Sequence, residues 1–242
     1  MCRECPKFLI HRTVMNFKNP FSRLTRFEFI LWISSLVVVS LSFILSPEPD
    51  LLSLIASLVG VTSLIFIARG MAFGQFLIII FAILYGIVSI RFSYWGEMIT
   101  YLFMSAPAAL ASLIAWLKNP YGKGDEVKVR PPLTTRAWLF LSLVTALVTF
   151  AFYFILKALG TANLAFSVLS VTTSFFAAGL TFLRIPYYAL AYAANDIVLI
   201  VLWVLATLES FEYLPMIFCF VMFLINDIYG FISWRRMERR QG

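Results

Sequence analysis

The sequence contains little charge, histidine or cysteine. Only 13% of its 242 residues are charged, one is His and three are Cys, whereas 62% are hydrophobic. The mean hydropathy is +0.92. A water-soluble domain needs a polar exterior, and a chain of this composition cannot supply one. The composition therefore predicts an integral membrane protein.

Several motifs of enzymes are also missing. The sequence has no GxxxxGK[ST] phosphate loop, no HExxH and no GxSxG. These motifs bind nucleotide phosphates, bind a catalytic zinc and present a serine nucleophile, respectively. Their absence disfavours ATP-driven transport and the common membrane hydrolases, and we expect no enzyme activity and no cofactor. Cys2, Cys5 and His11 would give three zinc ligands, but no second pair follows at zinc-finger spacing, so we expect no metal site.

Long apolar runs dominate what is present. A run of about 20 residues is long enough for a helix to cross the hydrocarbon core of a bilayer. Eight such runs are separated by short polar segments, and we expect an all-α protein with eight transmembrane helices. They lie at residues 28–46, 51–68, 72–90, 95–117, 137–156, 162–183, 187–206 and 212–233.

The basic residues predict the orientation. If the N-terminus is cytoplasmic, all but Arg91 and Lys157 of the 19 Lys and Arg residues fall in cytoplasmic segments. This asymmetry obeys the positive-inside rule. We therefore expect a multi-pass protein of the cytoplasmic membrane with both termini in the cytoplasm, in contact with lipid and not with nucleic acid. The first apolar run is too long for the core of a signal peptide, and translation can begin at Met1 or Met15.

A loop at residues 119–136, rich in Pro and Gly, divides the chain into two triplets of helices. The triplets run parallel, because a single helix between them restores the starting side, and this is the SWEET-like arrangement of sugar-type transporters, with a midplane site between two parallel three-helix repeats. Each triplet ends with a tryptophan, Trp116 or Trp234. The predicted parts are an N-terminal region with an extra helix (1–50), the first repeat (51–118), a loop with a linker helix (119–157), the second repeat (158–234) and a basic tail (235–242).

The candidate site begins with Asn195 and Asp196, in the middle of the seventh run. An ionisable side chain at that depth costs roughly 2.5–3.5 kcal/mol, so it is usually kept for function. Tyr188 and Tyr192 share a helical stripe with Asn195. We expect these four residues to bind a substrate.

Other polar residues at membrane depth extend this candidate site. Asn226 and Asp227 form a second Asn-Asp pair in the last run, and Asp227 is equally suited to an ion pair with an arginine near the helix ends. Gln75 has four hydrogen-bonding capacities to satisfy, and Thr173 lies in a Thr-Thr-Ser stretch. We add Asn226, Gln75 and Thr173 to the expected substrate-binding residues.

Three stretches resemble the PnuC family of bacterial vitamin transporters: RIPYYALAYAANDIVLIVLW, NDIYGFISWRRMERRQ and WLKNPYGKGDEVKV. The resemblance implies a core of three, one and three helices with an optional N-terminal helix, and a homotrimer. It also implies facilitated diffusion of nicotinamide riboside, which a cytoplasmic kinase then traps by phosphorylation. Some family members carry a Trp-x-x-Trp pair one turn before the asparagine. Tyr188 and Tyr192 lie in the matching stretch here, and tyrosine rings also stack on a pyridinium.

Three alternatives stay open at this stage. Another vitamin, such as thiamine or riboflavin, would fit a family member with altered aromatic residues. Asp196 and Asp227 would also serve as a proton relay in a symporter. Finally, the Asn-Asp pairs would hold helices together in a membrane scaffold or sensor that transports nothing.

Overall fold

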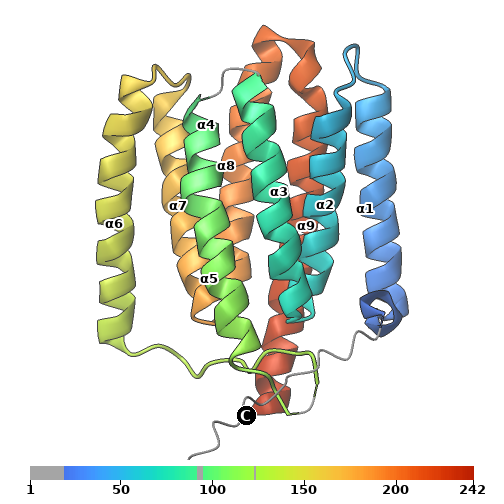
Figure 1. Ribbon diagram of the computed structural model, residues 1–242, viewed down its shortest axis with the longest axis vertical. Helices are drawn as coiled ribbons and strands as arrows, with labels where there is room; N and C mark the ends of the chain where they lie inside the picture. The colour runs from blue at the N-terminus through green and yellow to red at the C-terminus, as the bar shows by residue number, and fades with distance from the viewer. Residues whose placement is uncertain (1–18, 92–94, 123) are drawn as a thin grey trace, which may run out of the picture.

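A computed structural model describes residues 19–91, 95–122 and 124–242 as a bundle of helices (Figure 1). Its only extended pairing within these ranges consists of two isolated bridges, Met71 with Glu126 and Pro120 with Val127. The candidate ligands Cys2, Cys5 and His11 lie outside the described residues, as does Met15. The predicted all-α class is confirmed.

Among the described residues, eight helical spans are long and apolar enough to cross a membrane, as predicted. Two of them are composite, because α4, η2 and α5 form one continuous span and η3 leads into α9. In chain order the elements are η1 (Pro20–Arg23), α1 (Arg26–Ile44), α2 (Leu51–Ala68), α3 (Ala72–Arg91), α4 (Trp95–Ile99), η2 (Thr100–Ser105), α5 (Ala106–Leu117), α6 (Thr135–Ala158), α7 (Leu164–Phe182), α8 (Tyr188–Glu209), η3 (Phe211–Tyr213) and α9 (Leu214–Gln241).

Six of these spans form a closed ring. Contacts join α2 to α3, α3 to α5, α5 to α7, α7 to α8, α8 to α9 and α9 back to α2. The remaining two spans lie outside the ring: α1 contacts α2 and α9, and α6 contacts α7 (Figure 1). The members of the ring are the two predicted triplets, and the two outer spans are the predicted extra helix and linker helix. Whether the triplets are structural repeats stays a prediction.

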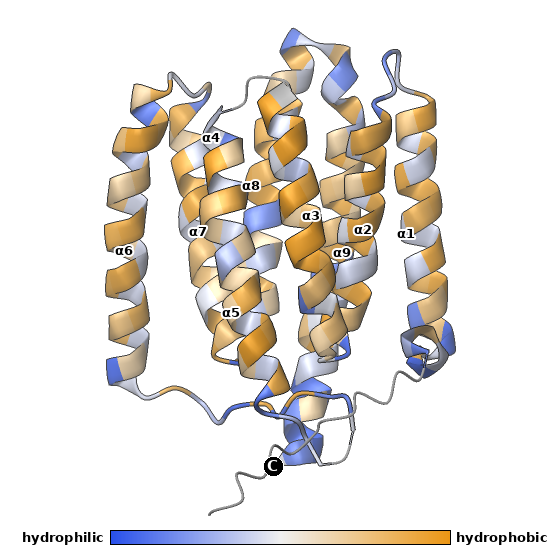
Figure 2. Cartoon of the chain, in the orientation of Figure 1, coloured by the Kyte–Doolittle hydropathy of each residue, from blue (hydrophilic) through white to orange (hydrophobic). Residues whose placement is uncertain are grey.

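The two ends of the bundle differ in charge. We call one the basic end, which carries the 119–134 loop and the last turns of α9, and the other the acidic end, which carries Glu48, Asp50, Glu97, Glu209 and Glu212. Hydrophilic residues gather at these ends, while the helix surfaces between them are mainly apolar (Figure 2). This distribution suits a protein surrounded by lipid at mid-height.

The fourth span contains a π-helical segment, η2. The N–H of Ala106 donates to the carbonyl of Tyr101, five residues earlier, and Pro107 follows in the first turn of α5. Proline has no N–H to donate and its ring excludes the carbonyl four residues before it, so a regular α-helix cannot run through this point. The helix accommodates Pro107 through this π-helical segment, which inserts an additional residue into the turn.

Candidate substrate cavity

A cavity lies inside the ring, and all six spans contribute to its wall. Its volume is about 140 Å³. An engineered apolar cavity of similar size holds one benzene molecule, so this space suits a single aromatic ring. Its polar and aromatic wall residues include Gln75, Glu97, Tyr101, Tyr188, Tyr192, Asn195 and Asp227. We call this space the central cavity.

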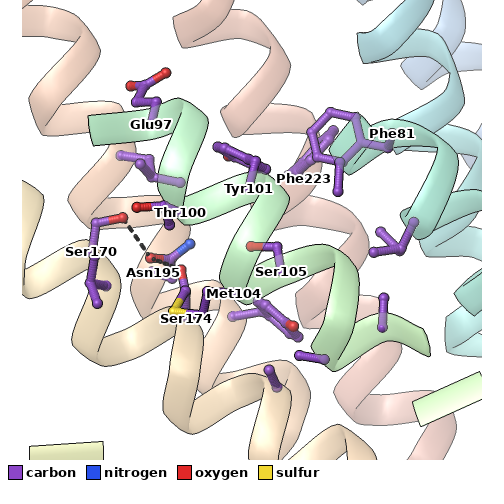
Figure 3. Close-up of a pocket in the computed structure, with 18 of the residues that line it drawn as sticks. Phe81, Glu97, Thr100, Tyr101, Met104, Ser105, Ser170, Ser174, Asn195 and Phe223 are labelled. Carbon is purple, nitrogen blue, oxygen red and sulfur yellow. Dashed lines mark hydrogen bonds between the residues drawn. The ribbon is translucent and has the colours of Figure 1, made fainter. Parts of the chain in front are cut away.

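Asn195 is fixed in the cavity wall by hydroxyl groups of α7 (Figure 3). Ser170 Oγ, Thr173 Oγ1 and Ser174 Oγ lie 3.2, 2.8 and 3.0 Å from its Oδ1 and donate to it. The side chain is 5% exposed. Three donors on one oxygen hold the amide in one orientation, so its NH₂ group is available to a molecule in the cavity. Thr173, an expected substrate ligand, contacts Asn195 and is not among the described residues that line the central cavity, so its role in binding stays a prediction.

The two tyrosines of the candidate site both line the central cavity. The rings of Tyr188 and Tyr192 contact each other edge to face, with centroids 6.3 Å apart. Gln75, from α3, also lines the cavity and is 3% exposed, and its Nε2 has no hydrogen-bond partner among the described residues. A buried donor without a partner costs about 1–3 kcal/mol, which a polar ligand would recover. The structure therefore brings Gln75 together with Tyr188, Tyr192 and Asn195.

The two Asn-Asp pairs are placed differently. Asp227 lines the cavity, and its side chain is within hydrogen-bonding reach of Asp196, which is 3% exposed and lies behind the wall. Asn226 points away from the cavity and donates to Ser35 of α1 at 3.0 Å. Of the second pair, the structure thus puts the carboxyl group rather than the expected amide on the wall. Arg235, a possible partner for Asp227, instead forms an ion pair with Glu238.

The side of the cavity formed by α4 and η2 was not predicted from the sequence. Glu97, Thr100, Tyr101, Met104 and Ser105 all line it, along α4 and η2 (Figure 3). A π-helical segment turns by less than 100° per residue, so its residues do not follow the stripe that an α-helix predicts. The available signals were Pro107 two residues after this segment and a carboxylate, Glu97, in an apolar run.

The basic end of the ring is closed by two tryptophans. Trp116 Nε1 donates to the carbonyl of Thr181 at 3.0 Å, and Trp234 Nε1 donates to that of Ile67 at 2.8 Å. The two indoles contact each other with centroids 5.3 Å apart, and neither is more than 2% exposed. Trp234 also contacts the ring of Tyr188 at 4.9 Å. The side chains between the central cavity and the basic end are therefore packed together.

A second cavity of about 280 Å³ lies at the acidic end. We call it the outer cavity. Its wall combines carboxylates with aromatic rings, and no Lys or Arg is among its described lining residues. Its acidic and aromatic members are Glu48, Asp50, Tyr85, Glu97, Trp203, Glu212 and Tyr213.

Comparison with known sequences identifies the family. The profile of a family described as nicotinamide mononucleotide transporter matches residues 50–236. The chain belongs to this family, the PnuC transporters. It is 28% identical to the nicotinamide riboside transporter PnuC of Neisseria mucosa over 221 residues, which are 89% of this chain and 83% of that protein. It is 23% identical to the Haemophilus influenzae protein of the same name, over 87% of this chain and 91% of the relative.

A solved structure agrees with this assignment. The crystal structure of the vitamin B3 transporter PnuC superposes with a TM-score of 0.78 at 27% identity, covering 90% of this chain and 94% of the other. The matched family region, residues 50–236, contains five spans of the ring, α6 and all but the last turn of α9, whereas α1 lies outside it. This PnuC family member is thus a multi-pass membrane transporter whose cavity lies within the family region.

Proposed function

We propose that the protein carries nicotinamide riboside across the bacterial cytoplasmic membrane by facilitated diffusion. The single observation that carries this proposal is the central cavity, which has room for one aromatic ring beside Tyr188 and Tyr192 and a fixed amide at Asn195. Tyrosine faces attract a pyridinium cation, and the amide complements a carboxamide or a ribose hydroxyl. Two relatives with this substrate in their names support the choice.

The charge of the cavity favours the riboside over the mononucleotide. Its described wall includes the carboxyl groups of Glu97 and Asp227 but no Lys or Arg. Sites that hold phosphate use arginine, lysine or several backbone N–H groups, because the dianion is strongly hydrated. A 5′-phosphate in this cavity would face carboxylates without a compensating cation. The riboside carries a positive ring and no phosphate, so it matches the electrostatics.

The sequence supports passive transport with the basic end in the cytoplasm. All but two of the 19 basic residues belong to segments that the positive-inside rule assigns to that side. A chain without a nucleotide-binding motif has no means of using ATP, so inward flux would depend on a cytoplasmic kinase that phosphorylates the riboside.

We further propose rocking of the two triplets as the transport motion, and a homotrimer as the assembly. The matching contacts within and between the triplets, α2–α3 with α7–α8 and α2–α9 with α7–α5, support a repeat.

Proton coupling is the second candidate, since the side chains of Asp196 and Asp227 meet in a buried position. Two carboxyl groups in such contact favour sharing one proton. Uptake into liposomes without a kinase distinguishes the mechanisms. With an imposed pH gradient and the membrane potential clamped at zero, facilitated diffusion only equilibrates the labelled riboside and is unaffected by an uncoupler. A symporter accumulates the riboside under these conditions and loses the accumulation when the uncoupler is added.

The Asn195→Ala variant tests the binding site. We expect its initial rate of riboside uptake into proteoliposomes to fall at least about fivefold, because an amide on a buried site contributes roughly 1–3 kcal/mol to recognition. The control is Asn163→Gly, which alters an exposed asparagine with a φ of 51° at the start of α7. Unchanged uptake by Asn195→Ala, at equal protein content and thermal stability, would remove Asn195 from the site.

A further inference from the structure

Glu97 occupies the boundary between the two cavities. Among the described residues it is the one that lines both the central and the outer cavity. It lies in the short helix α4, at the upper rim of the central cavity, one turn from Tyr101 (Figure 3). A molecule that moves from the outer cavity into the central one passes this carboxylate.

The surroundings of Glu97 favour a cation. The Tyr85 hydroxyl is within hydrogen-bonding reach of its carboxyl group, which orients the side chain at the boundary. The rings of Tyr85 and Tyr101 contact each other with centroids 4.4 Å apart beside it. No Lys or Arg belongs to the described wall of either cavity. A carboxylate next to aromatic faces, away from competing cations, attracts a delocalised positive charge.

The dimensions of the cavities determine which part of a nucleoside meets Glu97. The central cavity has room for about one aromatic ring, and the Trp116–Trp234 contact closes it toward the basic end. A base placed there must direct its sugar toward the outer cavity. The glycosidic nitrogen, which joins base and sugar, then lies at the boundary. In an N-glycosylpyridinium this nitrogen carries the formal positive charge.

We propose that Glu97 is a specificity-determining residue that selects cationic N-glycosylpyridinium nucleosides over neutral nucleosides of the same shape. This inference rests on the function proposed above and adds to it the basis of discrimination. Asn195 and the tyrosines recognise the shape and hydrogen-bonding groups of a nicotinamide ring, which a neutral analogue shares. Glu97 recognises the charge, which the analogue lacks.

The reduced riboside, in which the ring is a neutral dihydropyridine, provides the matched substrate. It keeps the carboxamide, the ribose and nearly the same volume, but its ring nitrogen is uncharged. We expect the purified protein in liposomes to take up the oxidised riboside with at least about tenfold higher kcat/KM than the reduced one, which corresponds to about 1.4 kcal/mol. In Glu97→Gln, we expect this preference to fall to about twofold, through loss of oxidised-riboside uptake while the reduced riboside is carried as before.

Two further variants serve as controls. Glu209→Gln removes a charge from an exposed position at the same end that lines neither cavity, so it must keep the wild-type preference. Glu97→Asp keeps the charge on a shorter side chain and must retain most of the preference. If Glu97→Gln is unstable in a thermal melt, Glu97→Ala replaces it, with the same expected loss of discrimination.

Several outcomes would overturn the proposal. An undiminished preference in Glu97→Gln would show that the charge is recognised elsewhere. An equal loss of both substrates in a stably folded variant would assign Glu97 to structure or to the sugar. A wild-type protein that carries both ribosides equally well would exclude charge selection altogether. By contrast, a wild-type protein that carries neither riboside would contradict the proposed function itself, so the two failures are distinguishable.

Discussion

The basic and acidic ends of the ring differ in what fills the space between the triplets. At the basic end, two buried indoles contact each other and each donates to a backbone carbonyl of the opposite triplet. At the acidic end, the corresponding space is a cavity of about 280 Å³ with carboxylates in its wall. Packing of large apolar surfaces stabilises one end, whereas the other end leaves charge accessible. A transporter needs this asymmetry, because only one side of its site is open at a time.

The closure at the basic end is built from reciprocal contacts. Trp116, near the end of the first triplet, donates to the last turn of α7, and Trp234, near the end of the second, donates to the last turn of α2. Two residues beyond the end of each of those helices lies a residue with positive φ, Gly70 at 67° after α2 and Arg184 at 61° after α7. The carbonyls of these two residues accept from the N–H groups of Val127 and Arg130 in the 119–134 loop. Each triplet thus donates a tryptophan hydrogen bond to the other, and the same loop is hydrogen-bonded to both triplets.

Trp234→Ala breaks the basic end and has the largest expected effect. Removing a fully buried indole leaves an unfilled cavity and typically costs about 3–5 kcal/mol. We expect a large fall in the melting temperature of the purified protein, with Trp116→Ala behaving similarly. Trp234→Phe keeps an aromatic ring and loses the donor to Ile67, and we expect a smaller fall, near 1 kcal/mol beyond the loss of volume.

The same variants test how the ends are coupled. If Trp234→Ala melted like the wild type, the contact of the two indoles would not hold the triplets together, and the contrast between the ends would be lost. Uptake measured with Trp234→Phe adds a second readout. A weaker closure should change the uptake rate while leaving the preference between oxidised and reduced riboside intact, because that preference is assigned to Glu97 at the opposite end.

The sequence predicted the basic end better than the acidic end. Span positions follow from runs of apolar residues, and all eight predicted runs overlap the observed spans. The tryptophans at the ends of the two triplets were visible as letters, although the exchange of their hydrogen bonds depends on the closed ring, which no local pattern specifies. The candidate residues Gln75, Tyr188, Tyr192 and Asn195 line the cavity, and their role in binding stays a prediction.

The acidic side of the cavity was beyond sequence reasoning for physical reasons. Tyr101 lies in the π-helical segment and Glu97 in α4 just before it, and this segment interrupts the 3.6-residue period used to assign faces. Asn226 and Asp227 are neighbours that differ by 100° in direction, so choosing between them requires the position of the ring's centre relative to α9. Asn226 is turned toward α1, where Ser35 accepts a hydrogen bond from it, and this contact joins residues 191 positions apart in the sequence.

Asp50→Ala tests how the acidic end is stabilised, with an intermediate effect. The Asp50 side chain accepts from the N–H of Ser53 at 2.8 Å and caps α2, so its contribution stays within one helix turn. Loss of such a cap costs about 1 kcal/mol. We expect a small fall in melting temperature. Asp50→Asn, which retains a capping oxygen without the charge, should melt close to the wild type, and equal destabilisation by both variants would assign the effect to charge.

Gln241→Ala has the smallest expected effect and acts at the basic end. Gln241 Oε1 accepts from the N–H of Val129 at 2.7 Å, and its Nε2 donates to the carbonyl of Val127 at 3.1 Å. These bonds fasten the 119–134 loop to the last turn of α9. Because both bonds join neutral groups, we expect about 0.5–1 kcal/mol and no change in the tryptophan contact.

Hydrogen exchange followed by mass spectrometry is the suitable measurement for this variant. Peptides that cover residues 124–134 should exchange faster in Gln241→Ala, while those that cover Trp116 and Trp234 stay protected, and Arg239→Ala, at an exposed position on the same turn, serves as the control. Faster exchange around both tryptophans would mean that the loop itself closes the basic end. The stability of that end would then come from backbone hydrogen bonds at its surface, rather than from the indoles buried between the triplets.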